Sequence, residues 1–468
     1  MVFSSINFIF YFLPAFLAVY FLVPAKWRNA VLFAASLIFY FYGIREQPIY
    51  FLLILLSIVV NYYAAKKIEK ERWKRRRKKW LIIGLTYNMA WLFLFKYLDF
   101  VIENVNHVSQ IVSGKEILGY THLILPIGIS FYTFQISSYL IDVYWKKVKA
   151  EKSILTLGTY LCMFPQLIAG PIVTYSSVQK QLAKRHVSFA KFEEGIREFT
   201  IGLGLKVLIA NQVGNLWTQV NTIGYESIST PMAWLGLLAF SLQIYFDFYG
   251  YSLMAKGLGM MIGFKFPDNF KNPYLALSMT DFWRRWHITL GSWFREYVYI
   301  PLGGNRHHMI RNLFVVWALT GLWHGASWNF VLWGLSIFVL ICIEKKGLGE
   351  LLERFKVLGH LYMLLVIPLS WLLFAVTDLK QIGLYLHRLF PVFQSQTAAI
   401  YQGDFLKYGK MYAVSLIAGL ICCTGLPRKI YQKKKYTLIV SIVLTAIFWG
   451  CIYCMYLGLD DPFLYFRF

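Results

Sequence analysis

One histidine, His324, lies inside an apolar segment, residues 317–333, that reads WALTGLWHGASWNFVLW. It is the only ionisable side chain of that segment. Burial disfavours the charged imidazole, so a neutral ring there is suited to act as a general base toward a hydroxyl or a thiol. The small neighbours Gly325 and Ala326 would let a substrate or another helix approach the ring. A core histidine bonded to a backbone carbonyl is the alternative.

A second segment, residues 272–305, is strongly aromatic but also carries six acidic or basic side chains: Asp281, Arg284, Arg285, His287, Arg295 and Glu296. A charge at the bilayer centre costs at least about 2.5 kcal/mol, so these groups need mutual pairing, snorkelling or a wet cavity. We therefore expect this segment to line a funnel on the cytoplasmic side.

Two interpretations of this segment stay open. In the first, it binds a polyanionic acyl donor such as coenzyme A or a phosphopantetheine carrier, because the guanidinium fork matches phosphate. The residues assigned to this donor site are Asp281, Trp283, Arg284, Arg285, Trp286 and Arg295. In the second, the segment is an amphipathic helix at the membrane interface, with Trp283, Trp286 and Trp293 as anchors.

The elements that must position these residues are membrane helices. Of the 468 residues, 58% are hydrophobic and only 15% charged, whereas soluble domains carry about a quarter charged residues. We expect one membrane-embedded domain over residues 1–468, all-α, with about eleven transmembrane helices plus re-entrant segments around a central tunnel. The expected spans are residues 6–24, 29–43, 49–65, 80–95, 120–142, 199–217, 232–248, 313–323, 328–343, 361–376, 411–423 and 437–456. Residues 154–175 contain Pro165 and the pair Gly170–Pro171, which predict a broken, re-entrant hairpin.

The net charge of +24 is explained by topology and not by nucleic acid. Ten basic residues lie between positions 66 and 79, and further basic clusters follow at 146–152, 180–197 and 428–435. Because Lys and Arg collect in cytoplasmic loops, these loops are predicted to be cytoplasmic and both termini extracytoplasmic. The expected partners include membrane lipids and exclude nucleic acid. The spacing of His and Cys indicates no metal site.

The motifs DFWRRWHITLGSWFREYVYIPLGGNR and GLWHGASWNFVLWG, at residues 281–306 and 321–334, resemble those of the membrane-bound O-acyltransferase (MBOAT) family. The similarity is closest to the bacterial branch typified by alginate O-acetyltransferase. LPIGISFYTFQISSYLIDVY, FPQLIAGPIV and QIYFDFYGYSLMAKGLGMMIGF resemble the same branch in the same order. Residues 272–334 thus contain the expected catalytic core.

The resemblance implies a catalytic role for His324 and places His287 at the entrance of the same tunnel. Trp323, Gly325 and Asn329 are expected to line that tunnel. No cofactor is expected to stay bound; acetyl-CoA, or another acyl thioester, is the implied cytoplasmic donor. The resemblance places the protein in a bacterial cell membrane. The acetyl group would cross that membrane to a secreted or anchored SGNH/esterase-like transferase, for O-acetylation of an extracytoplasmic polysaccharide.

The tail, residues 460–468, ends in FLYFRF and matches the spacing F-x-Y-x-x-F of a partner peptide in teichoic acid D-alanylation. This likeness predicts Tyr465 as an acyl carrier, and an aromatic interfacial anchor is the alternative.

Other functions stay open beside acetyl export. A D-alanyl or other short-acyl exporter would share the fold, although those exporters are shorter and lack the long form of the first motif. Acylation of a lipid or protein within the membrane is another. A non-enzymatic transporter or flippase would also need intramembrane charge and broken helices, and it usually shows repeat symmetry.

Overall fold

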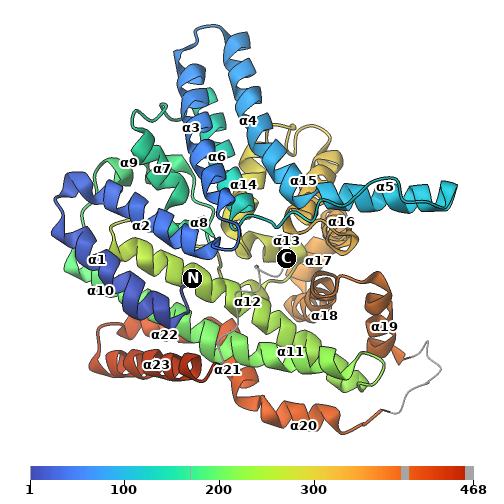
Figure 1. Cartoon of the computed structure of the whole chain (residues 1–468). Coiled ribbons are helices and arrows are strands. Elements are labelled where there is room, and N and C mark those ends of the chain that lie inside the picture. The colour runs from blue at the N-terminus through green and yellow to red at the C-terminus, as the bar shows by residue number, and fades with distance from the viewer. Residues whose placement is uncertain (1, 169, 392–399, 459–468) are drawn as a thin grey trace.

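The computed structural model describes residues 2–168, 170–391 and 400–458, and within them the regular secondary structure is entirely helical. This confirms the predicted all-α class (Figure 1). The α-helices are α1 (Leu13–Leu22), α2 (Arg28–Gly43), α3 (Ile49–Lys70), α4 (Lys74–Lys96), α5 (Leu98–Ser113), α6 (Ile129–Tyr144), α7 (Ile154–Cys162), α8 (Phe164–Leu167), α9 (Tyr175–Ala183), α10 (Phe189–Gly204), α11 (Asn211–Ile223), α12 (Thr230–Met261), α13 (Met279–Arg285), α14 (Ile288–Phe294), α15 (Met309–His324), α16 (Trp328–Ile343), α17 (Gly349–Arg354), α18 (Lys356–Ala375), α19 (Leu379–Leu389), α20 (Asp404–Met411), α21 (Ala413–Cys423), α22 (Leu426–Lys434) and α23 (Leu438–Tyr456). Shorter 3-10 or π-helical turns are η1 (Phe8–Phe12), η2 (Ala25–Trp27), η3 (Leu205–Ala210), η4 (Pro273–Leu275), η5 (Arg295–Tyr299) and η6 (Glu344–Leu348).

Fewer helices are long enough to span a membrane than the sequence suggests. In the described part of the chain, α3, α12, α18 and α23 are each long and apolar enough to cross a bilayer. The number rises to six if each of two bent pairs, α4–α5 (58°) and α20–α21 (71°), is one span. The predicted count of about eleven is not confirmed, because helices such as α2, α15 and α16 have only 16 residues each, fewer than the roughly 20 that a straight crossing needs.

One predicted span differs from the helix observed, and one predicted break is present. The run at 120–142 has no regular secondary structure up to Pro126, and α6 begins only at Ile129, directly after Gly128 with its φ of +76°. The predicted break within 154–175 is confirmed: α7 ends at Cys162, Pro165 lies in the first turn of the short α8, and the chain is non-helical from 170 to 174. A glycine therefore lies directly before the start of α6, and a proline lies at the break between α7 and α8.

The long helix α12 forms the centre of the fold and packs along α10 (Figure 1). Their backbones touch where two glycines face each other: a Cβ on Gly202 would lie 2.5 Å from the Gly250 carbonyl oxygen, and one on Gly250 would lie 2.6 Å from that of Gly202. One helical turn away, Lys206 Nζ contacts Asp247 Oδ1 at 2.5 Å, with both side chains buried. A close helix contact and an internal ion pair thus fix the core.

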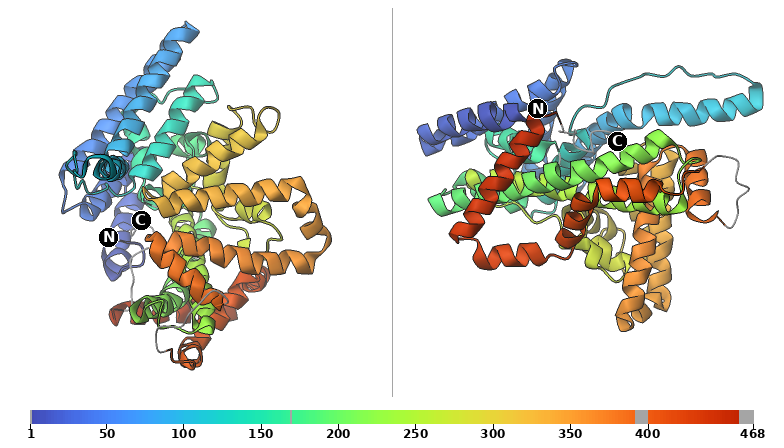
Figure 2. Two further views of the ribbon diagram at one scale, coloured as in Figure 1. Left: turned by 90° about the vertical axis from the view of Figure 1, so that its right-hand side faces the viewer. Right: turned by 90° about the horizontal axis from the view of Figure 1, so that it is seen from below.

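The turn that joins α13 and α14 packs on α12, where His287 contacts Phe248. Helices α15 and α16 are close neighbours, and α16 also packs on α18 (Figure 2, orange). The α15–α16 contact depends on Gly321 and Gly334, because a Cβ on Gly321 would lie 2.5 Å from the Phe330 carbonyl oxygen and one on Gly334 2.4 Å from that of Trp317. In Figure 1, α3, α4 and α6 form a separate group of neighbours, from which the bent helix α5 projects.

Candidate active site

His324 is the last residue of α15 and lines a pocket of about 250 Å³. The pocket wall consists of Lys96 at the end of α4, residues 124–131, Ile168, Trp323 and His324. The side chain of His324 is otherwise enclosed, since the residue is only 6% exposed. The lone histidine of the apolar segment therefore lies at a pocket and not on the lipid-facing side of its helix.

Aromatic rings surround the imidazole. The rings of Trp323, Trp333 and Phe374 meet the His324 ring edge-on, with centroids 4.9, 5.0 and 5.1 Å away. Asn329 lies beside them at the start of α16, where its Nδ2 donates to the Leu373 carbonyl oxygen at 3.0 Å. Asn329 thereby ties α16 to α18 next to Phe374.

Gly325 follows α15 in extended conformation, and the ring of Phe330 leaves no room for a larger residue there. A Cβ at this position would lie 2.1 Å from the ring of Phe330. Of the three residues predicted to line a tunnel, only Trp323 shares the His324 pocket; Gly325 and Asn329 shape the turn and the helix beside it.

The C-terminal end of α15 is held by two residues at the α4–α5 bend. Lys96 Nζ donates to the carbonyl oxygens of Trp323 at 2.5 Å and His324 at 3.3 Å. The Tyr97 hydroxyl donates to the carbonyl oxygen of Leu322 at 2.9 Å. Unpaired carbonyls at a helix C-terminus favour a cationic or donating partner. Neither residue is predicted from the sequence; the available signal is a lysine that ends an apolar run.

His287 lies near the same tryptophan. It precedes α14 with a φ of +44°, and the residue is 2% exposed. Its Nδ1 is 3.1 Å from Asn269 Oδ1, and its ring lies 6.0 Å from the ring of Trp323, centroid to centroid. Its Nε2 is buried and has no hydrogen-bond partner among the described residues. The fold therefore places Trp323 in ring contact with both predicted histidines.

The tryptophans of α13 and α14 are interior residues. Trp286 is 2% exposed and packs on Trp371 with centroids 4.9 Å apart. Trp293 is 7% exposed and stacks on Phe134 at 3.9 Å. The half-buried Trp283 lies 5.4 Å from Trp333, which contacts His324. An interfacial helix anchored by these three indoles is therefore wrong, because they pack against protein rings.

The charges of this segment are partly paired, as its composition requires. Asp281 accepts from Arg285 Nε at 2.9 Å, and Glu296 pairs with Lys147. Arg284 and Arg295 are exposed, near the ends of α13 and α14. A donor site at these arginines stays a prediction.

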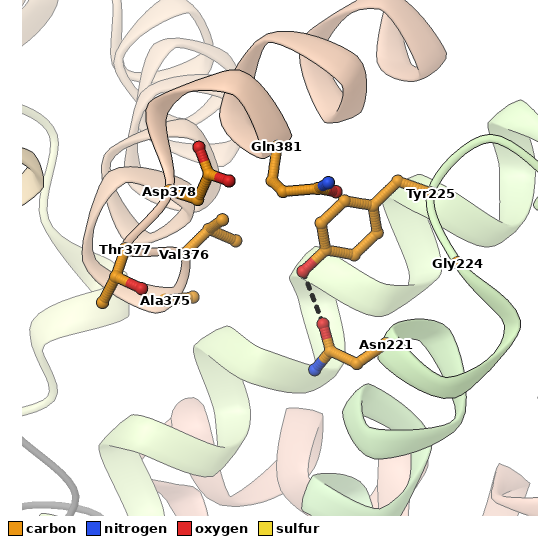
Figure 3. Close-up of a pocket in the computed structure, with 8 residues that line it drawn as sticks. All are labelled: Asn221, Gly224, Tyr225, Ala375, Val376, Thr377, Asp378 and Gln381. Carbon is orange, nitrogen blue, oxygen red and sulfur yellow. Dashed lines mark hydrogen bonds between the residues drawn. The ribbon is translucent and has the colours of Figure 1, made fainter.

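A second pocket, of about 300 Å³, lies between the end of α11 and the α18–α19 turn (Figure 3). It is lined by Asn221, Gly224, Tyr225, residues 375–378 and Gln381. The Tyr225 hydroxyl donates to Asn221 Oδ1 at 2.5 Å. None of the predicted site residues in the described ranges lines this pocket, although Phe374, which contacts His324, immediately precedes its wall. Tyr465 lies outside the described residues.

Comparison with known proteins supports the resemblance. The model of the MBOAT, membrane-bound O-acyltransferase family, matches residues 146–387. The probable alginate O-acetylase AlgI of Pseudomonas aeruginosa is 39% identical over 81% of this chain and 73% of its own length. The peptidoglycan O-acetyltransferase of Helicobacter pylori is 35% identical over 81% and 78%. The teichoic acid D-alanyltransferase of Bacillus subtilis is 28% identical over 47% and 59%. The chain therefore belongs to the membrane-bound O-acyltransferase family and is a multi-pass membrane acyltransferase.

Proposed function

We propose that this protein is a bacterial inner-membrane O-acetyltransferase that takes an acetyl group from cytoplasmic acetyl-CoA and passes it across the membrane for O-acetylation of an extracytoplasmic polysaccharide. Two of the relatives, named as an alginate O-acetylase and a peptidoglycan O-acetyltransferase, are each aligned over 81% of the chain. The teichoic acid D-alanyltransferase aligns over only 47%, so D-alanyl export is the less supported alternative.

The observation that carries the proposal is the position of His324 on the wall of a pocket, enclosed by aromatic rings on its other sides. In the proposed reaction, an acceptor hydroxyl gives its proton to a ring nitrogen of His324 as its oxygen bonds to the thioester carbonyl carbon. The intermediate then collapses, the C–S bond breaks, and His324 returns the proton to the leaving thiolate. Low polarity around the ring keeps this base neutral before the reaction.

The donor would enter from the cytoplasmic side, on which the positive-inside rule places the basic loops. There the exposed Arg284 and Arg295 are the proposed contacts for the donor phosphates, with Arg285 held beside them by Asp281. Trp283 and Trp286 would form the apolar wall between that surface and His324. The buried Nε2 of His287 would meet the acyl group on its way to Trp323.

On the outer side the acetyl group would pass to a secreted or anchored SGNH/esterase-like transferase. Tyr465 is the proposed carrier: its phenol oxygen would take the acetyl group at His324 and release it to that partner. By the positive-inside rule, both termini would be extracytoplasmic. Mass spectrometry of protein trapped with labelled donor tests the carrier; absence of acetyl-Tyr465, with full activity in Tyr465→Phe, would contradict it.

The test of the function is reconstitution in proteoliposomes with radiolabelled acetyl-CoA, measuring the release of free coenzyme A and the transfer of label. We expect His324→Ala to lose about 10²- to 10⁴-fold in rate with the protein still folded. His360→Ala is the matched control, because His360 is an exposed histidine on α18. Solute movement without donor consumption would instead identify a transporter. A parallel series with D-alanyl and longer acyl thioesters tests the choice of acyl group.

A further inference from the structure

Lys96 is the cationic side chain in the wall of the His324 pocket. It ends α4, far from His324 in sequence, directly before the chain bends by 58° into α5. The residue is half-buried, and the surface that it keeps faces a pocket that it shares with the proposed base. A lysine at such a position needs a reason, because ionisable groups inside a membrane protein are costly.

The ammonium is held in place by the end of α15. An ammonium group has three N–H donors. In the described structure the acceptors of Lys96 Nζ are the carbonyl oxygens of Trp323, at 2.5 Å, and His324, at 3.3 Å. Both carbonyls belong to the last turn of the helix, where the negative end of the helix dipole also favours a cation. Two donors are thus used to fix the group, and the third is left for a ligand in the pocket.

We propose that Lys96 is a catalytic residue that donates its third N–H to the carbonyl oxygen of the acyl group, where negative charge develops during transfer. This inference rests on the proposed function, with His324 as the base. As the acceptor oxygen bonds to the carbonyl carbon, the C=O electron pair moves to the oxygen, and Lys96 stabilises the resulting oxyanion. When the C–S bond breaks, the pair returns to the carbonyl and the thiolate leaves with the proton held by His324.

The arrangement has the properties of an oxyanion site. The donor is oriented before the reaction by two fixed acceptors, and it lies on the same pocket as the base. Preorganised donors of this kind contribute more than donors in water, because they need not reorganise as the charge forms. Removal of one such donor typically lowers kcat by about 10²- to 10³-fold.

The competing explanation is that Lys96 only caps α15. The chain offers a matched control for this, since Tyr97 also caps α15, through the Leu322 carbonyl oxygen at 2.9 Å, but is not part of the pocket wall. A purely structural role predicts similar consequences for the loss of either cap. A catalytic role predicts that only the loss of Lys96 affects the chemical step.

The experiment compares Lys96→Met, Lys96→Arg and Tyr97→Phe in proteoliposomes supplied with radiolabelled acetyl-CoA, with the midpoint of thermal unfolding measured for each. For Lys96→Met we expect kcat to fall by about 10²- to 10³-fold while KM for the donor stays within about threefold. Lys96→Arg should recover at least about tenfold of that loss, because it keeps a cationic donor. Tyr97→Phe should keep kcat within about threefold of wild type, since a lone neutral hydrogen bond contributes little.

A kcat of Lys96→Met within about threefold of wild type, or no greater loss than in Tyr97→Phe, would overturn the proposal. If Lys96→Met unfolds, Lys96→Gln, which retains a donor for the Trp323 carbonyl, is measured in its place against the same limits. His324→Ala in the same series separates the two claims. If His324→Ala keeps full activity while Lys96→Met loses it, His324 is not the base but the role of Lys96 stands. If both variants keep full activity, this pocket is not the active site. A wild type that consumes no acyl thioester refutes both.

Discussion

The Nδ1 atom of His287 lies 3.1 Å from Oδ1 of Asn269, which also accepts from the Thr289 hydroxyl at 2.9 Å. An amide oxygen is only an acceptor, so this contact assigns the proton to Nδ1 and leaves Nε2 as the acceptor nitrogen of the ring. The orientation and tautomer of His287 are therefore set by a residue that precedes α13.

Asn269 is accordingly expected to support transfer through His287. We predict that Asn269→Leu lowers the acetyl transfer rate by about tenfold or more, because the ring loses its fixed tautomer and orientation. His287→Ala should show a loss at least as large. The double variant should lose no more than His287→Ala alone, since the two residues act as one unit. Additive losses in the same radiolabel assay would mean that Asn269 acts independently of His287.

The Asp99 carboxylate is predicted to anchor the segment that leads into the wall of the His324 pocket. Its Oδ1 accepts from the Thr121 backbone N–H and hydroxyl, both at 2.8 Å, and its Oδ2 accepts from the His122 N–H at 2.9 Å. These bonds anchor the segment that continues into the pocket wall at residues 124–131. Asp99→Ala should therefore make this segment more sensitive to limited proteolysis and change transfer by less than about tenfold, since no pocket residue is altered. Glu103→Ala on the same helix is the control, and equal cleavage of the two variants would contradict the anchor.

The buried ion pair between Lys206 and Asp247 is predicted to matter for stability more than for chemistry. Asp247→Ala leaves an unpaired buried cation, which typically costs about 3–5 kcal/mol, so we expect a strong fall in the thermal midpoint and in the yield of folded protein. The double variant Lys206→Met/Asp247→Leu should recover most of that loss, because it removes both charges. Size-exclusion profiles and thermal unfolding in detergent check this. A single variant as stable as wild type would show that the pair contributes nothing.

The sequence predicted the location of the candidate site better than its geometry. A lone histidine in an apolar run was enough to select His324, because ionisable groups are rare in such segments. The Lys96 contact could not be predicted in this way, since it joins positions 227 apart through a bend at the end of α4. Trp286 and Trp293 were open to two interpretations because an aromatic side chain suits both a membrane interface and a protein core. The number of spans is not confirmed for a related reason: apolar run length does not reveal where a helix bends.

The close α15–α16 contact provides a test of how the site is positioned. A Cβ at Gly334 would lie 2.4 Å from the carbonyl oxygen of Trp317 and 3.2 Å from the Gly321 Cα, so Gly334→Ala must push the two helices apart. Because His324 ends one of these helices and Trp333 and Phe330 lie on the other, we expect Gly334→Ala to lower both the thermal midpoint and the transfer rate, the latter by about tenfold or more.

Gly383 on α19 is the matched control for Gly334, since a Cβ there would meet nothing within 4 Å. Gly383→Ala is expected to leave activity unchanged and to stabilise the helix by about 0.5–1 kcal/mol, the ordinary difference in helix propensity between the two residues. Thermal unfolding and the radiolabel assay on the two variants measure both effects. If Gly334→Ala behaved like Gly383→Ala, the separation of α15 and α16 would not determine the position of His324.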